Sequence, residues 1–146
     1  MYRLWFLFLL SLGGCGSGRE CTLMYVPDSV RVSFVRSSRW EPGRYRVEAA
    51  DAVCEATFPA APESSGIVPC QTPTNAPMQS FLEVDAARSG LEALVYESGA
   101  PQTLVVRVLW NDTELAREML TPTYSQSEPN GRGCGVTRSG SAQMSF

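Results

Sequence analysis

Residues 104–120 read LVVRVLW-ND-TELAREML, two runs of strand-forming residues on either side of an Asn-Asp pair. Asparagine and aspartate tolerate the positive backbone angles of a two-residue hairpin turn. Such a turn places Trp110 opposite Thr113 and Val108 opposite Leu115. With this register one face carries Leu104, Val106, Val108, Trp110, Leu115 and Met119, and the other face sets Arg107 between Glu114 and Glu118. The stretch predicts a β-hairpin whose first strand, apolar on nearly both faces, lies at the centre of a sheet.

Alternation with a period of two residues also marks the earlier part of the chain. Val30, Val32 and Phe34 alternate with Arg31, Ser33 and Val35, and after Gly43 the residues Tyr45, Val47 and Ala49 alternate with Arg44, Arg46 and Glu48. This period is typical of half-buried strands. Further strands are expected at residues 52–58, 81–84, 91–96 and 141–146. A helix over 86–97 is the alternative, which Gly90 disfavours.

The segment 59–77 holds five prolines together with several serines and threonines, and it predicts an irregular loop. Seven or eight short strands without long helical stripes predict an all-β fold, an antiparallel two-sheet sandwich of immunoglobulin-like architecture. Residues 21–146 are enough for a single domain of ordinary size with its own core.

The first fourteen residues have the three parts of a secretory signal peptide: a basic start with Arg3, an apolar core over 4–10 and small residues before Cys15. The apolar core is too short to span a bilayer, which requires about 20 residues. The stretch Leu12-Gly13-Gly14-Cys15 resembles the lipobox of bacterial lipoproteins. This resemblance implies that residues 1–14 are removed and that Cys15 carries the lipid.

Residues 15–20 would then form a lipidated cysteine with a short tether, and the membrane would be a partner through this lipid. Gly16 stands where an aspartate would resemble an inner-membrane retention signal, so the resemblance favours the outer membrane of the cell envelope. Several acyl chains hold a protein on its membrane far more firmly than one.

With Cys15 lipidated, four cysteines remain in an exported chain, an even number that predicts two disulfides. Three connectivities exist. We favour Cys54 with Cys70, which closes the proline-rich loop, and Cys21 with Cys134, which ties the start of the domain to its last segment.

The closing segment contains Pro122, Tyr124, Pro129-Asn130-Gly131 and Cys134-Gly135. It resembles the corresponding part of a group of uncharacterised bacterial lipoproteins with small β-domains. The resemblance covers about a tenth of the chain, and it implies no activity.

The charged residues exclude several function classes. Every basic residue is an arginine, and removal of Arg3 leaves eleven against fifteen acids, so nucleic acid is not an expected partner. Without histidine or lysine, histidine-based triads, a Ser-Lys dyad and histidine-based metal sites cannot be built. Catalysis would rest on carboxylate pairs, either Glu83 with Asp85 or Glu114 with Glu118, which solvated strand faces explain equally well. We therefore predict no enzyme, no metal and no cofactor.

One basic and aromatic stretch suggests a binding patch, formed by Arg36, Arg39 and Trp40 in a loop between two strands. Exposed arginine and tryptophan are typical of binding surfaces, here for an anionic polymer, a headgroup surface or an envelope protein. Alternatively, Trp40 packs on the rim of the core while the arginines of this stretch pair with Glu48, Glu83 and Asp85.

The sequence thus predicts a lipid-anchored envelope protein, a non-enzymatic structural or binding module. The alternatives are a protease inhibitor that presents the 59–77 loop and a carboxylate-dependent hydrolase.

Overall fold

The computed structural model describes residues 21, 25–58, 66–72, 80–85, 90–97 and 99–146. These residues form ten strands and no helix. The strands are β1 (Ser29–Val35), β2 (Gly43–Ala49), β3 (Ala52–Phe58), β4 (Ile67–Pro69), β5 (Phe81–Asp85), β6 (Gly90–Tyr96), β7 (Leu104–Trp110), β8 (Thr113–Leu120), β9 (Thr123–Ser127) and β10 (Thr137–Ser145). The predicted all-β fold is confirmed.

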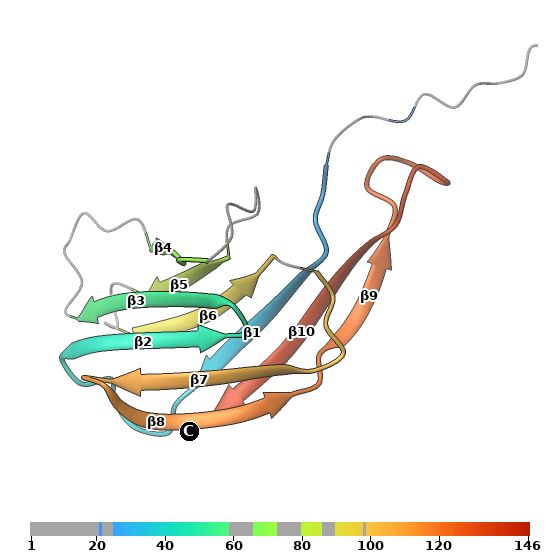
Figure 1. Cartoon of the computed structure of the whole chain (residues 1–146). Helices are drawn as coiled ribbons and strands as arrows, with labels where there is room; N and C mark the ends of the chain where they lie inside the picture. The colour runs from blue at the N-terminus through green and yellow to red at the C-terminus, as the bar shows by residue number, and fades with distance from the viewer. Residues whose placement is uncertain (1–20, 22–24, 59–65, 73–79, 86–89, 98) are drawn as a thin grey trace, which may run out of the picture.

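The strands form two sheets that face each other (Figure 1). The larger sheet has the order β4-β5-β6-β1-β10-β9, and the smaller has the order β3-β2-β7-β8. β7 lies between β2 and β8, which confirms the predicted central position of this apolar strand. The core between the sheets buries alternate residues of their strands, among them Val30, Val32, Tyr45, Val47, Leu82, Leu94, Val106, Val108 and Met144. This is the two-sheet sandwich that the alternating pattern predicts.

The hairpin of β7 and β8 forms around Asn111 and Asp112, whose φ angles of 45° and 66° are those of the expected turn. Trp110 lies opposite Thr113 as predicted, but the next part of the register is wrong. The pairing shifts after this point, so that Val108 faces Ala116 rather than Leu115.

This bulge adds one residue to β8 and turns every later side chain to the other face. Met119, predicted on the core face, is 70% exposed, and Leu120 is buried in its place. Glu118 now lies opposite Val106. The predicted register is that of a hairpin without a bulge. The hydrophobic pattern of so short a hairpin does not indicate an additional residue in one strand.

Two strands were absent from the sequence prediction. β4 lies within the segment expected to be an irregular loop and pairs with β5, and β9 forms in the tail and pairs with β10. Both are short edge strands. The helix considered over 86–97 is not found in its described part, because residues 90–96 form β6.

The sheets are not wholly antiparallel. β1 runs parallel to β10, with Ser29 opposite Ser139 and Val35 opposite Ser145, whereas every other strand pair in the described residues is antiparallel. A parallel pair requires a connection that crosses the sandwich. Here the connection consists of almost the whole domain, because β1 and β10 are its first and last strands.

Both favoured disulfides are confirmed. Cys54 of β3 is bonded to Cys70, which follows β4, so this bridge joins one edge of the smaller sheet to one edge of the larger. Beside it, Val53 and Gln71 exchange two backbone hydrogen bonds of 2.9 and 2.7 Å. The second bridge joins Cys21 to Cys134, in the loop between β9 and β10.

The predicted signal peptide, Cys15 and the tether lie outside the described residues, as do parts of the 59–77 loop. Within the described part of the chain, no helix has the length and hydropathy needed to cross a membrane.

Candidate functional site

The candidate binding patch lies in the segment that connects β1 to β2 and therefore the two sheets. It stands at the end of the sandwich where β1 and the parallel strand β10 both finish. The start of this segment is attached to the last residue of the chain, because Ser37 N donates to Phe146 O at 3.1 Å and Phe146 N donates to Val35 O at 3.0 Å.

Trp40 packs on the rim of the core. Its ring meets Tyr45 at 5.1 Å and Phe146 at 5.8 Å, both edge to face. On a third side it lies against Gly90 of β6, where a Cβ atom would fall 2.8 Å from Trp40 Cγ. The side chain is half-buried and contacts both sheets, so it closes this end of the sandwich.

Arg36 is attached to the same aromatic group. Its Nη1 donates to the hydroxyl of Tyr45 at 3.2 Å, and its Nε donates to Ser38 Oγ at 2.9 Å. The guanidinium carbon lies 5.1 Å from the centroid of the Trp40 ring, which is cation–π geometry. Arg36 therefore has partners of its own, and Trp40 holds it in place.

The backbone of the loop is fixed by the hydroxyl of Tyr45. This oxygen accepts from Glu41 N at 3.0 Å and donates to Glu41 O at 3.0 Å. A buried tyrosine side chain thus satisfies its polar end through the loop, which holds the loop in one conformation.

Arg39 is the exposed member of the patch. In the described residues it takes part in no hydrogen bond or ion pair. The structure thus brings Arg36 and Trp40 together and leaves Arg39 on the surface. Trp40 therefore packs on the rim of the core, which is the alternative interpretation of this residue.

The arginines of the strands pair with carboxylates, as that interpretation also predicts. Arg31 of β1 contacts Glu83 of β5 at 2.6 Å and Glu92 of β6 at 3.5 Å. The hydrogen bond with Glu83 raises the pKa of Arg31 above its ordinary value, since the carboxylate stabilises the charged form.

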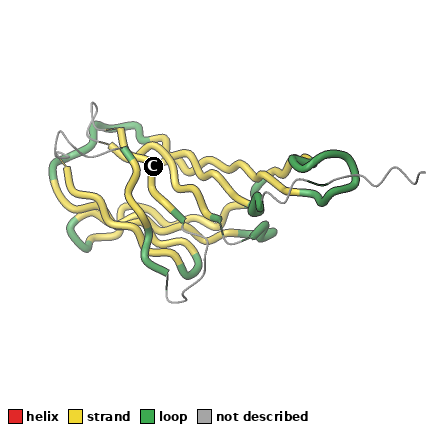
Figure 2. Tube along the Cα trace, turned by 90° about the horizontal axis from the view of Figure 1, so that it is seen from above, coloured by secondary structure: helices red, strands yellow, loops and turns green. Residues whose placement is uncertain are grey.

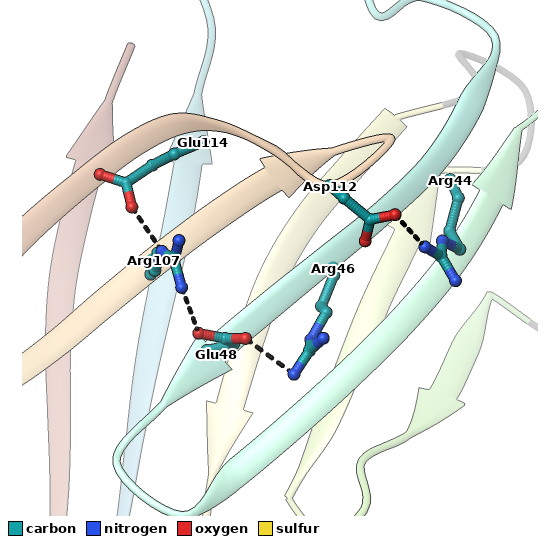
Figure 3. A network of polar contacts seen from close by, with 6 residues as sticks. All are labelled: Arg44, Arg46, Glu48, Arg107, Asp112 and Glu114. Carbon is teal, nitrogen blue, oxygen red and sulfur yellow. Dashed lines mark hydrogen bonds and ion pairs between the residues drawn. The ribbon is translucent and has the colours of Figure 1, made fainter.

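A second network covers the outer face of the smaller sheet (Figure 3). Glu48 of β2 accepts from Arg46 at 2.9 Å and from Arg107 of β7 at 3.2 Å, and Arg107 also donates to Glu114 of β8. These hydrogen bonds, above all that with Glu114, raise the pKa of Arg107. Beside them, Arg44 pairs with Asp112 of the hairpin turn at 2.6 Å.

One member of each predicted carboxylate pair is bonded to an arginine. Glu83 is occupied by Arg31, and Glu114 by Arg107. The bulge in β8 separates Glu114 from Glu118 in register, so that they face Leu109 and Val106. Glu83 and Glu114 thus take part in ion pairs on the strand faces.

A surface pocket that the sequence did not predict lies beside the Cys54–Cys70 bridge. It measures about 540 Å³ and is lined by Arg46, Asp51, Val53, Glu55, Pro69, Gln71 and Thr72. Asp51 accepts a hydrogen bond from the hydroxyl of Tyr96 at 3.2 Å. The pocket depends on the pairing of Val53 with Gln71 across the two sheets, for which the sequence carries no signal. No cluster of metal-ligating side chains occurs among the residues described.

Comparison of the chain with protein families, curated proteins and solved structures gave no match. The chemistry of the surface is therefore the basis for a functional proposal.

Proposed function

We propose that this chain is a lipid-anchored protein of the bacterial cell envelope, a non-enzymatic structural or binding module. The main support for this proposal is the pairing of its cysteines. Of the five cysteines in the chain, four are joined in the bridges Cys21–Cys134 and Cys54–Cys70. The fifth is Cys15, the residue at which the lipobox resemblance expects the lipid.

The two disulfides also support export, because such bridges form and persist in oxidising compartments. One bridge joins the edges of the two sheets, and the other joins Cys21 to the loop between β9 and β10. A bridge that closes a loop of about 15 residues contributes about 3 kcal/mol through the unfolded state. A protein outside the cytoplasm gains this stability without a larger core.

The position of the patch supports a partner other than the anchoring membrane. Cys21 is fixed to the loop between β9 and β10, and the loop with Arg39 lies where β1 ends. A strand rises about 3.3 Å per residue, so the seven residues of β1 alone separate these two ends by about 20 Å. Lipid at Cys15 would hold the first end near the bilayer and leave Arg39 facing away from it.

Of the partners considered for this patch, an anionic polysaccharide or an envelope protein therefore suits it better than a headgroup surface. The exposed guanidinium of Arg39 is the group that such a partner would contact. The pairing of the candidate carboxylates with arginines favours binding over catalysis.

The anchor is tested by mass spectrometry of the mature protein together with fractionation of the cells that make it. We expect a chain that begins at Cys15 and carries acyl groups, and that is recovered with the membranes. Cys15→Ala should abolish both, whereas the matched variant Ser17→Ala should change neither. A mature chain that keeps residues 1–14, or a Cys15 without acyl groups, would refute the proposal.

A further inference from the structure

The hairpin of β9 and β10 projects beyond the body of the sandwich (Figure 2). Figure 1 shows the same hairpin extending past β7 and β8, with the described residues that precede β1 beside it. Its tip is bonded to Cys21 through Cys134. This end of the molecule is thus formed by two segments that lie far apart in the sequence.

Exposed apolar side chains gather at this end. Tyr25 is 74% exposed, Val136 56% and Val26 36%. Val26 and Val136 are neighbours, because Thr137 Oγ1 donates to the backbone oxygen of Val26 at 3.1 Å. Three of the seven large apolar residues exposed in the described chain thus lie within a few residues of the Cys21–Cys134 bridge.

The position of these residues accounts for their exposure. Val26 and Val136 precede the paired parts of β1 and β10, which begin at Ser29 and Thr137. The smaller sheet does not extend over the projecting hairpin (Figure 1). Apolar side chains at this end therefore lack the opposing layer that buries Val30 and Val32.

This apolar end is held in a defined shape. Asp28 accepts from the backbone N of Arg138 at 2.7 Å and from its Nε at 3.0 Å. In the loop, Glu128 accepts from Gly133 N at 3.0 Å, and Gly131 O accepts from Cys134 N at 3.0 Å. With the disulfide, these contacts fix the N-terminal segment against the hairpin.

We propose that this end, defined by Tyr25, Val26 and Val136, is a membrane-contact surface on which the domain rests at the bilayer interface. The inference rests on the proposed lipidation of Cys15. Cys21 lies six residues after Cys15, and an extended chain covers at most about 3.6 Å per residue, so the backbone of Cys21 lies within about 22 Å of that of Cys15. Cys21 follows Cys15 closely in the sequence, and its bridge to Cys134 therefore sets this end of the domain near the proposed anchor.

The side chains suit the interface between water and hydrocarbon. Tyrosine places its apolar ring among the lipids and its hydroxyl among the headgroups. Of the neighbouring charges, Arg138 pairs with Asp28 at 3.0 Å, and Glu128 accepts a hydrogen bond from Gly133 N. We expect contact to depend mainly on apolar burial.

The test uses the full-length protein, purified with its lipid and reconstituted into phosphatidylcholine vesicles with bromine on the acyl chains. Bromine quenches tryptophan within the bilayer. Tyr25→Trp is compared with Met119→Trp, which replaces a residue of similar exposure, 70%, on the outer face of the smaller sheet. The wild-type emission of Trp40 and Trp110 is subtracted from both.

We expect the added emission of Tyr25→Trp to shift to the blue and to be lost in brominated vesicles, while that of Met119→Trp stays unchanged. Equal quenching in both variants, or none, in protein whose lipid is verified by mass spectrometry would overturn the membrane-contact surface and leave the anchor intact. Absence of the lipid would refute the anchor itself. A blue shift that also occurs in detergent and grows with protein concentration would assign the surface to a second copy of the chain and overturn the inference.

Discussion

The indole ring of Trp40 lies over Gly90, with its Cγ atom 2.8 Å from the position that a Cβ on residue 90 would occupy. One residue belongs to the loop that connects the two sheets, and the other begins β6 of the larger sheet. A glycine is therefore required at residue 90 for the aromatic group of Trp40, Tyr45 and Phe146 to close this end of the core.

Gly90→Ala should displace Trp40 and destabilise the fold by about 1–3 kcal/mol, the usual cost of overpacking. Denaturant unfolding followed by tryptophan emission would measure the loss, and the emission of the folded variant should shift to the red. Ser33→Ala, on the outer face of the neighbouring strand β1, serves as the control. Unchanged stability and emission in Gly90→Ala would show that the ring does not pack there.

Replacement of both Cys54 and Cys70 by alanine should lower the free energy of unfolding by about 3 kcal/mol. The bridge spans 16 residues and joins the edges of both sheets. Loss of the bridge raises the conformational entropy of the unfolded chain. In the folded state, the two hydrogen bonds between Val53 and Gln71 would still join the edges of the two sheets. Urea titration of the oxidised proteins checks the value. A loss under about 1 kcal/mol would mean that these contacts hold the edge without the bridge.

Tyr124→Phe should change the dependence of stability on pH. The ring lies over Gly140, and the hydroxyl donates to Pro101 O at 2.7 Å. Burial raises the pKa of Tyr124 above the ordinary value of 10.0, while the charge of Arg138 lowers it to a smaller extent and that of Asp28 raises it. The folded state therefore retains this proton more firmly than the unfolded state.

The resulting stabilisation is complete below pH 10.0 and is lost as the pH rises through the folded pKa. Near pH 7, Tyr124→Phe should cost about 1 kcal/mol for the missing hydrogen bond. The difference between the two proteins should shrink above pH 10, as followed by urea unfolding at a series of pH values. A constant difference up to pH 11 would contradict the burial of this hydroxyl.

Glu48→Gln should destabilise the outer face of the smaller sheet, because Arg46 and Arg107 would lose the carboxylate between them (Figure 3). The loss should be smaller than that of the Cys54–Cys70 bridge, and it should decrease in high salt, which screens exposed charges. Thermal unfolding at low and high salt compares the variant with Glu55→Gln on β3. Equal behaviour of both variants would mean that the network adds no stability.

Arg39→Ala should weaken binding to a polyanion without loss of stability, because its side chain is exposed and takes part in no hydrogen bond or ion pair with a described residue. Retention on immobilised dextran sulfate in a salt gradient would measure the effect. Arg117→Ala, at an exposed arginine of β8, is the control and should elute like the wild type. Trp40→Ala is unsuitable for this test, since it would also remove the packing on Tyr45 and Phe146. If both arginine variants elute alike, Arg39 has no special role in binding.

The sequence by itself determined the class of the fold and most of its strands, and it favoured the two disulfides that the structure contains. Alternation in runs such as 30–34 and 45–49 is decided locally, because one face of each strand must be buried. The turn at Asn111 and Asp112 is likewise a property of two residues. With Cys15 expected to carry the lipid, three connectivities are open to the other four cysteines.

Only the tertiary structure decided the register of β8, the two short edge strands and the parallel pairing of β1 with β10. It also decided that Arg36 and Trp40 join the rim of the core while Arg39 remains outside, and that Val26 and Val136 are exposed. Each of these features depends on which distant segment of the chain lies beside a given strand. The backbone hydrogen bonds that join two strands are nearly the same for any side chains, so the sequence does not specify the partner. The hydrophobic pattern states that a residue can be buried, whereas the opposing layer determines whether it is.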